Sequence, residues 1–378
     1  MLQLFNRRPN VHSAAAELDR QGVAADVREK FADYLDKAQP REVYHVNPRY
    51  LAKRLGLPER ETLRLVVMAL YAGLVTLHWD VRCPACGSYN DHDRLNDLHR
   101  EIQCTVCRVK FAPKLDDEVR VTFSVHPRFR SLYTDANDKQ FRAEVDERLG
   151  PVFGRALLVL PDFQRLFPQE RLLPDESLEV ARMALLFTDL AGSTALYAQR
   201  GDPRAYHLVR LHFEELFNAA NRHNGTVVKN IGDAVMAAFQ TPAEALAAAL
   251  DMQNDIAALN RRERLTGDEA LVLKVGLHSG PCLNVTLNDR PDYFGTTVNI
   301  AARVQGLSRG GDVVFTDAIL HDADAMALVP GQPLETSQAE LKGIEGDLTV
   351  HRLAAVMPSP RARSPTVPTG EGPWVRAG

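Results

Sequence analysis

The chain has 378 residues and a formal net charge of -4 at pH 7, with 45 basic and 49 acidic side chains. This balance excludes a strong overall attraction to nucleic acid or to an anionic membrane. The longest nearly apolar run, Leu65–Leu77, is shorter than the roughly 20 residues of a membrane-spanning helix. No charged-then-apolar leader opens the chain, so we expect no secretory signal and a cytoplasmic location. The length predicts two or three domains.

Residues 1–82 are predicted to form a helical and winged-helix-like region. Val11–Ala38 is rich in helix-forming residues and lacks proline, and Gly22 divides it. Asn47-Pro48 and Pro58 are typical starts of two further helices.

The helix after Pro58 would occupy the recognition position of a winged helix, with the strand Leu74–Val81 as the wing. One interpretation is DNA binding, and the other is a scaffold for packing or dimerisation. Glu59 and Glu61 offset the neighbouring Arg60 and Arg64, whereas a DNA-reading helix is usually basic. We therefore expect a scaffold and no DNA binding.

Residues 83–115 contain two CxxC pairs separated by seventeen residues. This spacing is typical of a zinc ribbon, in which four thiolates complete a closed tetrahedral site with a structural role. An iron site of the rubredoxin type and four unrelated thiols are the alternatives. His92 and His99 are expected to be surface residues of the intervening loop. The predicted ligands of one structural Zn²⁺ are Cys83, Cys86, Cys104 and Cys107.

Residues 116–177 are predicted to connect the two halves of the chain. Glu118–Val125 alternates as a half-buried strand does, and Phe141–Gly150 has a helical pattern. Val152–Leu173 is apolar but broken by prolines. Its expected role is that of a connector, with a domain boundary near Ser177.

Residues 178–356 alternate strand and helix patterns, which predicts an α+β sandwich with helices on a mainly antiparallel sheet. The strands are expected at Leu178–Leu190, Leu271–His278 and Val313–Thr316, near Ala339–Leu341 and at Leu348–Leu353, with a hairpin at Val227–Phe239. The helices are expected at Tyr206–His223, after the capping box Thr241–Glu244, and at Thr297–Leu307. Gly280–Pro291 is expected to be a loop or short hairpin. The tail, residues 357–378, is rich in Pro, Ser, Gly and Arg and is predicted to be disordered.

Two carboxylates end apolar strands in this region. Asp189 follows Leu185–Thr188 and precedes a small-residue turn at Ala191–Thr194, and Asp233 lies at the turn of the Val227–Phe239 hairpin. One such aspartate is usually a turn former or a helix cap. Two together, beside backbone N–H groups at a helix start, favour a site for divalent cations and phosphates.

A third motif, DYFGTTVNIAAR, places Asn299 and Arg303 four residues apart on one helix face. Together with FTDLAGST, KNIGDAVMAAF and LKGIEG, it resembles the class III nucleotidyl cyclases, which are the adenylyl and guanylyl cyclases. The resemblance covers roughly Met183–Leu353. It implies a ferredoxin-like βαββαβ catalytic domain.

The reaction that the resemblance implies is attack of a nucleotide 3′-hydroxyl on its own α-phosphate, with release of pyrophosphate. Asp189 and Asp233 match the carboxylates that hold two Mg²⁺ or Mn²⁺ ions, and the Leu190 carbonyl is a further ligand by resemblance. The N–H groups of the turn, in Ala191, Gly192, Ser193 and Thr194, would bind phosphate oxygens.

The resemblance also assigns the substrate-binding residues. Lys229 and Asp292 match the base-reading positions, and a donor paired with an acceptor complements adenine, so ATP is the predicted substrate. Asn299 matches the residue that orients the ribose, Arg303 the one that stabilises the pentavalent phosphate, and Lys342 the one that binds the terminal phosphates. Some members carry arginine near Pro281, so this chain departs from them there.

In the family, the metal carboxylates of one subunit face the base, ribose and arginine positions of the other. All of these positions occur in this chain, so the resemblance implies a homodimer with two complete sites. Two alternatives to an adenylyl cyclase stay open at this point. One is a guanylyl cyclase, and the other is a zinc-ribbon and winged-helix regulator that uses the cyclase domain only to sense a nucleotide.

Overall fold

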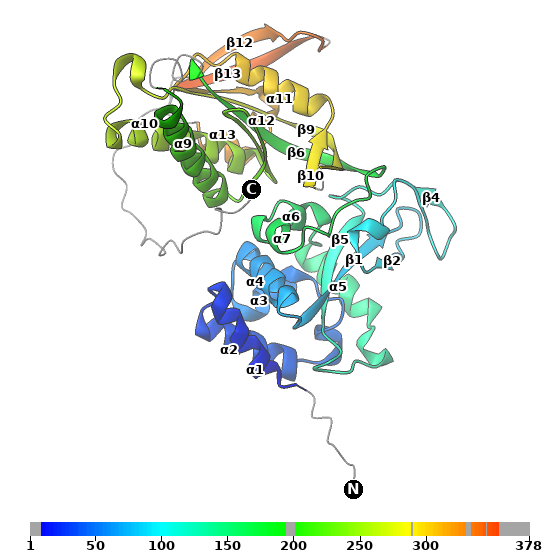
Figure 1. The fold of residues 1–378 in the computed structure, drawn as a ribbon. Helices are drawn as coiled ribbons and strands as arrows, with labels where there is room; N and C mark the ends of the chain where they lie inside the picture. Colours follow the sequence, from blue (N-terminus) through cyan, green and yellow to red (C-terminus); the bar gives the residue numbers. More distant parts are fainter. Residues whose placement is uncertain (1–8, 194–200, 289, 330–333, 345, 355–378) are drawn as a thin grey trace.

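The computed structural model describes residues 9–193, 201–288, 290–329, 334–344 and 346–354. Thr194 and the tail, residues 357–378, lie outside these ranges. Figure 1 shows an N-terminal half that packs against the sheet of a C-terminal half. No helix among the described residues combines the length and the apolar character that crossing a membrane requires.

The N-terminal helices lie where the sequence predicts them. Gly22 and Gly56 end helices in the left-handed conformation, with φ values of 75° and 69°, which glycine adopts without a steric penalty. Asn47 caps the helix that it precedes. The helices are α1 (Val11–Ala15), η1 (Ala16–Gln21), α2 (Ala25–Lys37), η2 (Pro40–Glu42), α3 (Pro48–Leu55) and α4 (Glu59–Tyr71).

The helix α4, which would be the recognition helix of a DNA reader, is used for packing inside the molecule. Most of its apolar residues are buried. Its two arginines contact other parts of the chain: Arg60 donates to the Asn224 carbonyl and Arg64 pairs with Asp162. These contacts agree with the scaffold interpretation of the winged-helix-like region.

A three-stranded sheet of order β2-β1-β5 follows, with β1 (Val75–Arg82), β2 (Tyr89–His92) and β5 (Val119–Val125). The sequence predicted a half-buried strand at β5, but every residue of β5 is buried. The reason is that a loop and a helix cover its polar face: His45 bonds to Asp80 and Ser124, and Asp146 of α5 (Lys139–Leu149) bonds to Arg120.

The short elements of the N-terminal half surround this sheet. They are η3 (Leu95–Asp97), β3 (Ile102–Gln103), β4 (Lys110–Phe111), η4 (Thr134–Ala136), α6 (Gly154–Leu158) and α7 (Pro161–Leu166).

The C-terminal half is built on a sheet of order β12-β13-β11-β9-β6-β8-β7, with β10 paired to β9. The part β9-β6-β8-β7, with its two long helices, has the predicted βαββαβ order and confirms the α+β fold. The strands are β6 (Ser177–Leu190), β7 (Thr226–Ile231), β8 (Ala234–Phe239), β9 (Leu273–Leu287), β10 (Arg290–Phe294), β11 (Asp312–Thr316), β12 (Leu334–Glu340) and β13 (Asp347–Ala354). The helices are α9 (Asp202–Arg222), α10 (Pro242–Arg262), η5 (Gly267–Glu269), α11 (Thr296–Gly306), α12 (Asp317–Leu320) and α13 (Ala323–Ala327).

One predicted boundary in this half was wrong. The strand expected to end at His278 continues to Leu287. It pairs there with β10, so the hairpin that was one of the two predictions for Gly280–Pro291 is confirmed, and the loop is not. Glycine and proline usually interrupt a strand, but here the partner β6 accommodates Pro281 with a bulge.

Different parts of the chain pack against the two faces of the large sheet. Leu186 and Phe239 face α9 and α10, whereas Leu185 and Phe187 face a core shared with Phe163 of the N-terminal half. Val152–Leu173, predicted to be a connector, contributes largely to that shared core. Pro161 begins the short helix α7 and Pro168 follows its end. The prolines therefore separate short helices that bury apolar side chains, and they do not make the segment an extended linker.

Candidate active site

The two carboxylates predicted to bind metal lie close together at one end of the sheet. Asp189 is the penultimate residue of β6, and Asp233 lies in the β7–β8 turn, where Gly232 has a φ of 65°. Asp233 accepts a hydrogen bond from the Leu190 backbone N–H at 3.3 Å. Burial and the charge of Asp233 raise the pKa of Asp189. A divalent cation would compensate such a pair, so Asp189 and Asp233 fit the role of metal ligands.

The turn after Asp189 supplies fewer free N–H groups than the sequence predicted. The Ala191 N–H donates to the Val272 carbonyl at 2.9 Å, so it is occupied. Gly192 is exposed with a φ of 72°, and Ser193 is half-buried at the helix start.

Lys229 of β7 and Asp292 of β10 form an ion pair, with 2.6 Å between Nζ and Oδ2. The second Asp292 oxygen accepts from the Tyr293 N–H, and the Asp292 side chain is 6% exposed. The Lys229 ammonium also lies 5.7 Å from the ring centre of Phe294. The fold therefore brings together two base-reading candidates, one donor and one acceptor.

Arg303 on α11 lies against the turn that contains Lys342. A Cβ atom added to Gly343 would be 3.6 Å from Nη1 of Arg303. That Nη1 atom is buried and has no hydrogen-bond partner among the described residues, which do not include residue 345 of the same turn. Asn299 is exposed one turn earlier on the helix, and Lys342 is exposed in the turn. An unpaired guanidinium N–H is ready to bind an anion such as phosphate.

The strand alternation shows which face carries these groups. Leu185 and Phe187 belong to the core shared with the N-terminal half, so Asp189 lies on the same face. Lys229 pairs across the strands with Met236, which is also in that core. Among the described residues, no hydrogen bond or ion pair joins the Asp189–Asp233 pair to Lys229, Asp292 or Arg303.

The four predicted zinc ligands converge in the N-terminal half. Their sulfur atoms all lie within 4.8 Å of one another. Two Sγ–Sγ distances, 3.6 Å for Cys83–Cys107 and 3.7 Å for Cys86–Cys104, fit the tetrahedral edge of about 3.8 Å that Zn–S bonds of about 2.3 Å produce. A Ser88 hydrogen bond, with backbone N–H groups, lowers the pKa of Cys104 to about 5, which favours the thiolate that binds metal.

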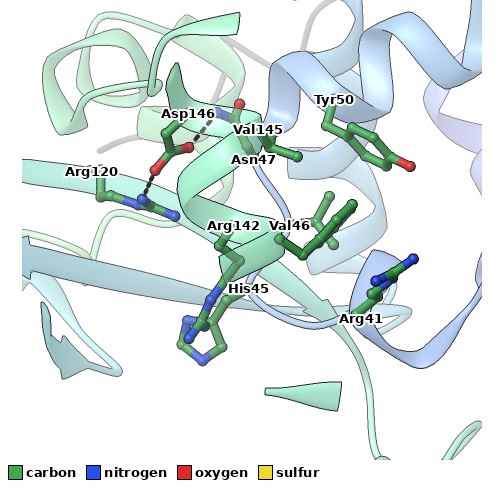
Figure 2. A pocket seen from close by; sticks show the side chains of 10 residues that line it. Arg41, His45, Val46, Asn47, Tyr50, Arg120, Arg142, Val145 and Asp146 are labelled. Carbon is green, nitrogen blue, oxygen red and sulfur yellow. Dashed lines mark hydrogen bonds and ion pairs between the residues drawn. The ribbon is translucent and has the colours of Figure 1, made fainter. Parts of the chain in front are cut away.

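A pocket of only about 10 Å³ in the N-terminal half is lined by three arginines, among them Arg41 and Arg142. Figure 2 shows that Asp146 bonds there to Arg120 and to Asn47. Arg41 pairs with Asp138, and Arg142 donates to the side-chain oxygen of Asn137. The charged groups around the pocket therefore already have partners, and the pocket does not resemble a substrate site.

Sequence reasoning missed three contributors to these sites. Lys274 lies directly opposite Asp189 in the β6–β9 ladder and lowers its pKa. Ser88 contacts the thiols of the ribbon, and Gly343, with a φ of 72°, forms the turn that lies against Arg303. No local pattern marks the first or the last of these, because each depends on strand register or on a long-range contact.

Two family models match the chain. The adenylate and guanylate cyclase catalytic domain matches residues 176–349, which contain every candidate catalytic residue named above. These residues form a class III cyclase catalytic domain. A family of unknown function (DUF5939) matches residues 11–148 of the N-terminal half.

The relatives of this cyclase domain include named adenylate cyclases. A putative adenylate cyclase 3 of Rhizobium meliloti is 30% identical over 202 residues, which are 52% of this chain and 32% of that protein. An adenylate cyclase of Anabaena cylindrica is 23% identical over 86% of this chain and 69% of its own length. The chain thus spans about a third of the first relative. Among solved structures, the adenylyl cyclase CyaB from P. aeruginosa aligns with a TM-score of 0.41 and 22% identity, over 50% of this chain and 100% of that one.

Proposed function

We propose that this chain is an adenylyl cyclase that converts ATP to 3′,5′-cyclic AMP and pyrophosphate. The observation that carries the proposal is the pairing of Asp189 with Asp233 inside a domain that matches the cyclase family. Two Mg²⁺ or Mn²⁺ ions held there would lower the pKa of the 3′-hydroxyl and neutralise the triphosphate.

The remaining residues position the nucleotide. Lys229 donates to adenine N1 and Asp292 accepts from the N6 amino group, which favours ATP over GTP. Asn299 orients the ribose. Arg303, whose Nη1 has no partner in the described part of the chain, donates to the phosphate as negative charge develops on it. Lys342, in the turn beside Arg303, binds the terminal phosphates.

The active unit is a homodimer in which each site takes its carboxylates from one subunit and Lys229, Asp292, Asn299 and Arg303 from the other. Within the described part of one chain, no hydrogen bond or ion pair joins the two groups, which supports this division. Apolar side chains beside the site also support a partner surface: Ile231 is 55% exposed and Phe294 is 45% exposed.

The cellular role that follows is intracellular signalling from the cytoplasm. The five cysteines are all free, which is usual in a reducing compartment.

The experiment that tests the activity is a turnover assay of the full chain with Mn²⁺ and either ATP or GTP. We expect cyclic AMP from ATP, a lower rate with GTP, and no product from Asp189→Asn. A folded chain that yields no cyclic product from either nucleotide would overturn the proposal, and faster turnover of GTP would make it a guanylyl cyclase.

Shared sites are tested by mixing two inactive variants. Asp189→Ala and Arg303→Ala each damage a different side of the site, so a mixed dimer retains one intact site and should regain measurable activity. Each variant alone is the control. Continued inactivity in a mixture shown to exchange subunits would argue against the shared arrangement.

A further inference from the structure

The strand that carries Asp189 contains a bulge. In the β6–β9 ladder, Val180 pairs with Cys282 and Met183 pairs with Gly280, so Ala181 and Arg182 both lie opposite Pro281. Proline has no backbone N–H to give to the ladder, and inside a sheet it is found mainly at edges and bulges. The strand β9 therefore cannot satisfy this part of β6 by itself.

Two side chains of the N-terminal half satisfy the bulge instead. Asp116 accepts the Ala181 N–H on Oδ1 at 2.8 Å and the Arg182 N–H on Oδ2 at 3.0 Å. Arg155 donates to the Arg182 carbonyl and lies 3.4 Å from the Asp116 carboxylate. The Asp116 side chain is only 6% exposed.

The neighbouring backbone holds Asp116 in this position. The Leu115 N–H donates to the Glu179 carbonyl at 2.9 Å, so the segment before Asp116 runs beside the start of β6. The strand β8 leaves this edge free, because it pairs with β6 only over residues 184–187. Asp116 thus replaces the ladder partner that β6 lacks at the bulge.

The register of β6 depends on this arrangement. A change of one residue in register moves every side chain of a strand to the opposite face. The bulge keeps Leu178 and Val180 in the shared core before it and Asp189 on that face after it. We propose that Asp116, with its charge balanced by Arg155, is a positioning residue that fixes the register of β6 and so keeps Asp189 facing Asp233. The catalytic consequence, though not the structural one, rests on the proposed function.

The test compares Asp116→Ala with Asp117→Asn in the full chain. Asp117 is the adjacent exposed acid and makes none of these contacts with β6, so its substitution removes a similar charge without touching the bulge. We expect Asp116→Ala to speed amide hydrogen exchange at residues 181–182 about tenfold. We also expect it to weaken binding of Mn²⁺ about tenfold, in the range seen for groups that orient a metal ligand. Asp117→Asn should behave as the wild type in both measurements.

Two further variants complete the design. Asp116→Glu retains the carboxylate and should recover part of the Mn²⁺ affinity, which a general loss of packing would not allow. If Asp116→Ala fails to fold, Arg155→Met tests the same contact, because it removes both the positive charge beside Asp116 and the donor to the Arg182 carbonyl. We expect a smaller shift in the same direction.

Each outcome decides one question. Unchanged hydrogen exchange, or faster exchange with unchanged Mn²⁺ affinity, would overturn the positioning role. Asp189→Asn is the control for Mn²⁺ binding, because any affinity that this variant retains does not depend on the Asp189 carboxylate. If Asp189→Asn binds Mn²⁺ as tightly as the wild type, the proposed function fails, whereas the effect of Asp116 on hydrogen exchange is still measured independently.

Discussion

Lys229 and Asp292 are 63 residues apart in the sequence and lie on β7 and β10, which do not pair with each other, yet the two side chains form a direct ion pair. Neither residue alone distinguishes a nucleotide site from a solvated strand end. Their contact creates a fixed donor beside a fixed acceptor, which is the pattern that complements adenine.

Substitution of Lys229 by Met should weaken the preference for ATP. The change removes the donor to adenine N1 and leaves the buried Asp292 carboxylate without its cation, so we expect KM for ATP to rise about tenfold. The ratio of ATP to GTP turnover should fall, as measured by initial rates with each nucleotide. Lys110→Met, at an exposed lysine paired with Glu101, is the control. An unchanged ratio would show that the ion pair does not select the base.

Substitution of Arg303 by Lys should affect the chemical step more than binding. Lysine retains the charge but cannot present the planar fork of donors, so we expect kcat to fall about 10²-fold while KM for ATP changes little. Arg309→Lys, at an exposed arginine paired with Glu335, is the matched control. A rise in KM with kcat preserved would instead assign Arg303 to ground-state binding.

The predicted zinc ribbon is an element whose geometry follows from its two CxxC turns. The backbone N–H groups of Val106 and Cys107 both donate to Cys104 Sγ at 3.4 Å, which prepares the thiolate for metal. The strand β1 leads directly into Cys83, and Cys83 bonds through its N–H to the Ser88 carbonyl. Metal at this site would therefore fix the end of the three-stranded sheet.

Elemental analysis should find about one structural Zn²⁺ per chain, additional to any ion at the aspartates. Cys83→Ser should lose this zinc and lower Tm, because an incomplete ligand set no longer holds the turns together. Cys282→Ser should retain the zinc, since Cys282 is buried away from the ribbon, where burial raises the pKa of its thiol to about 12. Zinc retained in Cys83→Ser, or neither zinc nor iron in the wild type, would contradict the assignment.

At the scale of the whole molecule, the two halves share one core. Leu157, Leu160 and Phe163 of the N-terminal half pack with Leu185 and Phe187 of the catalytic sheet. Hydrogen bonds cross the same boundary, from Thr286 to the Leu172 carbonyl and from Gln240 to the Ala156 carbonyl. The cyclase sheet thus depends on the N-terminal half to bury one of its faces.

A fragment of residues 177–356 should be less stable than the full chain and prone to aggregation, because it exposes the apolar face that carries Asp189. A fragment of residues 150–356 retains α6 and α7 and should recover part of the lost stability. Size-exclusion chromatography and thermal unfolding of both fragments measure the difference. If the shorter fragment unfolds cooperatively at the Tm of the full chain, the shared core does not contribute to stability.

Much of the local structure could be predicted from the residues alone. Gly22 and Gly56 end helices, and the Thr241–Glu244 capping box begins one. Each depends only on the backbone conformation of a few adjacent residues, so its position in the sequence predicts the helix boundary. The CxxC spacing is also local, and it correctly indicated which four thiols converge. The fold class was predicted from the cyclase motifs, because four motifs in the same order as in the family indicate the family's fold.

The tertiary structure decided what depends on register and on long-range packing. Only the β6–β9 pairing shows that β9 passes through Pro281, that Lys274 opposes Asp189, and that the Ala191 N–H is already occupied. Only packing shows that residues 152–173, predicted to connect the two halves, contribute to the core that both halves share. Local patterns indicate the secondary structure that a segment prefers. These long-range contacts depend instead on which distant segment packs against it, and this is determined by the fold of the whole chain.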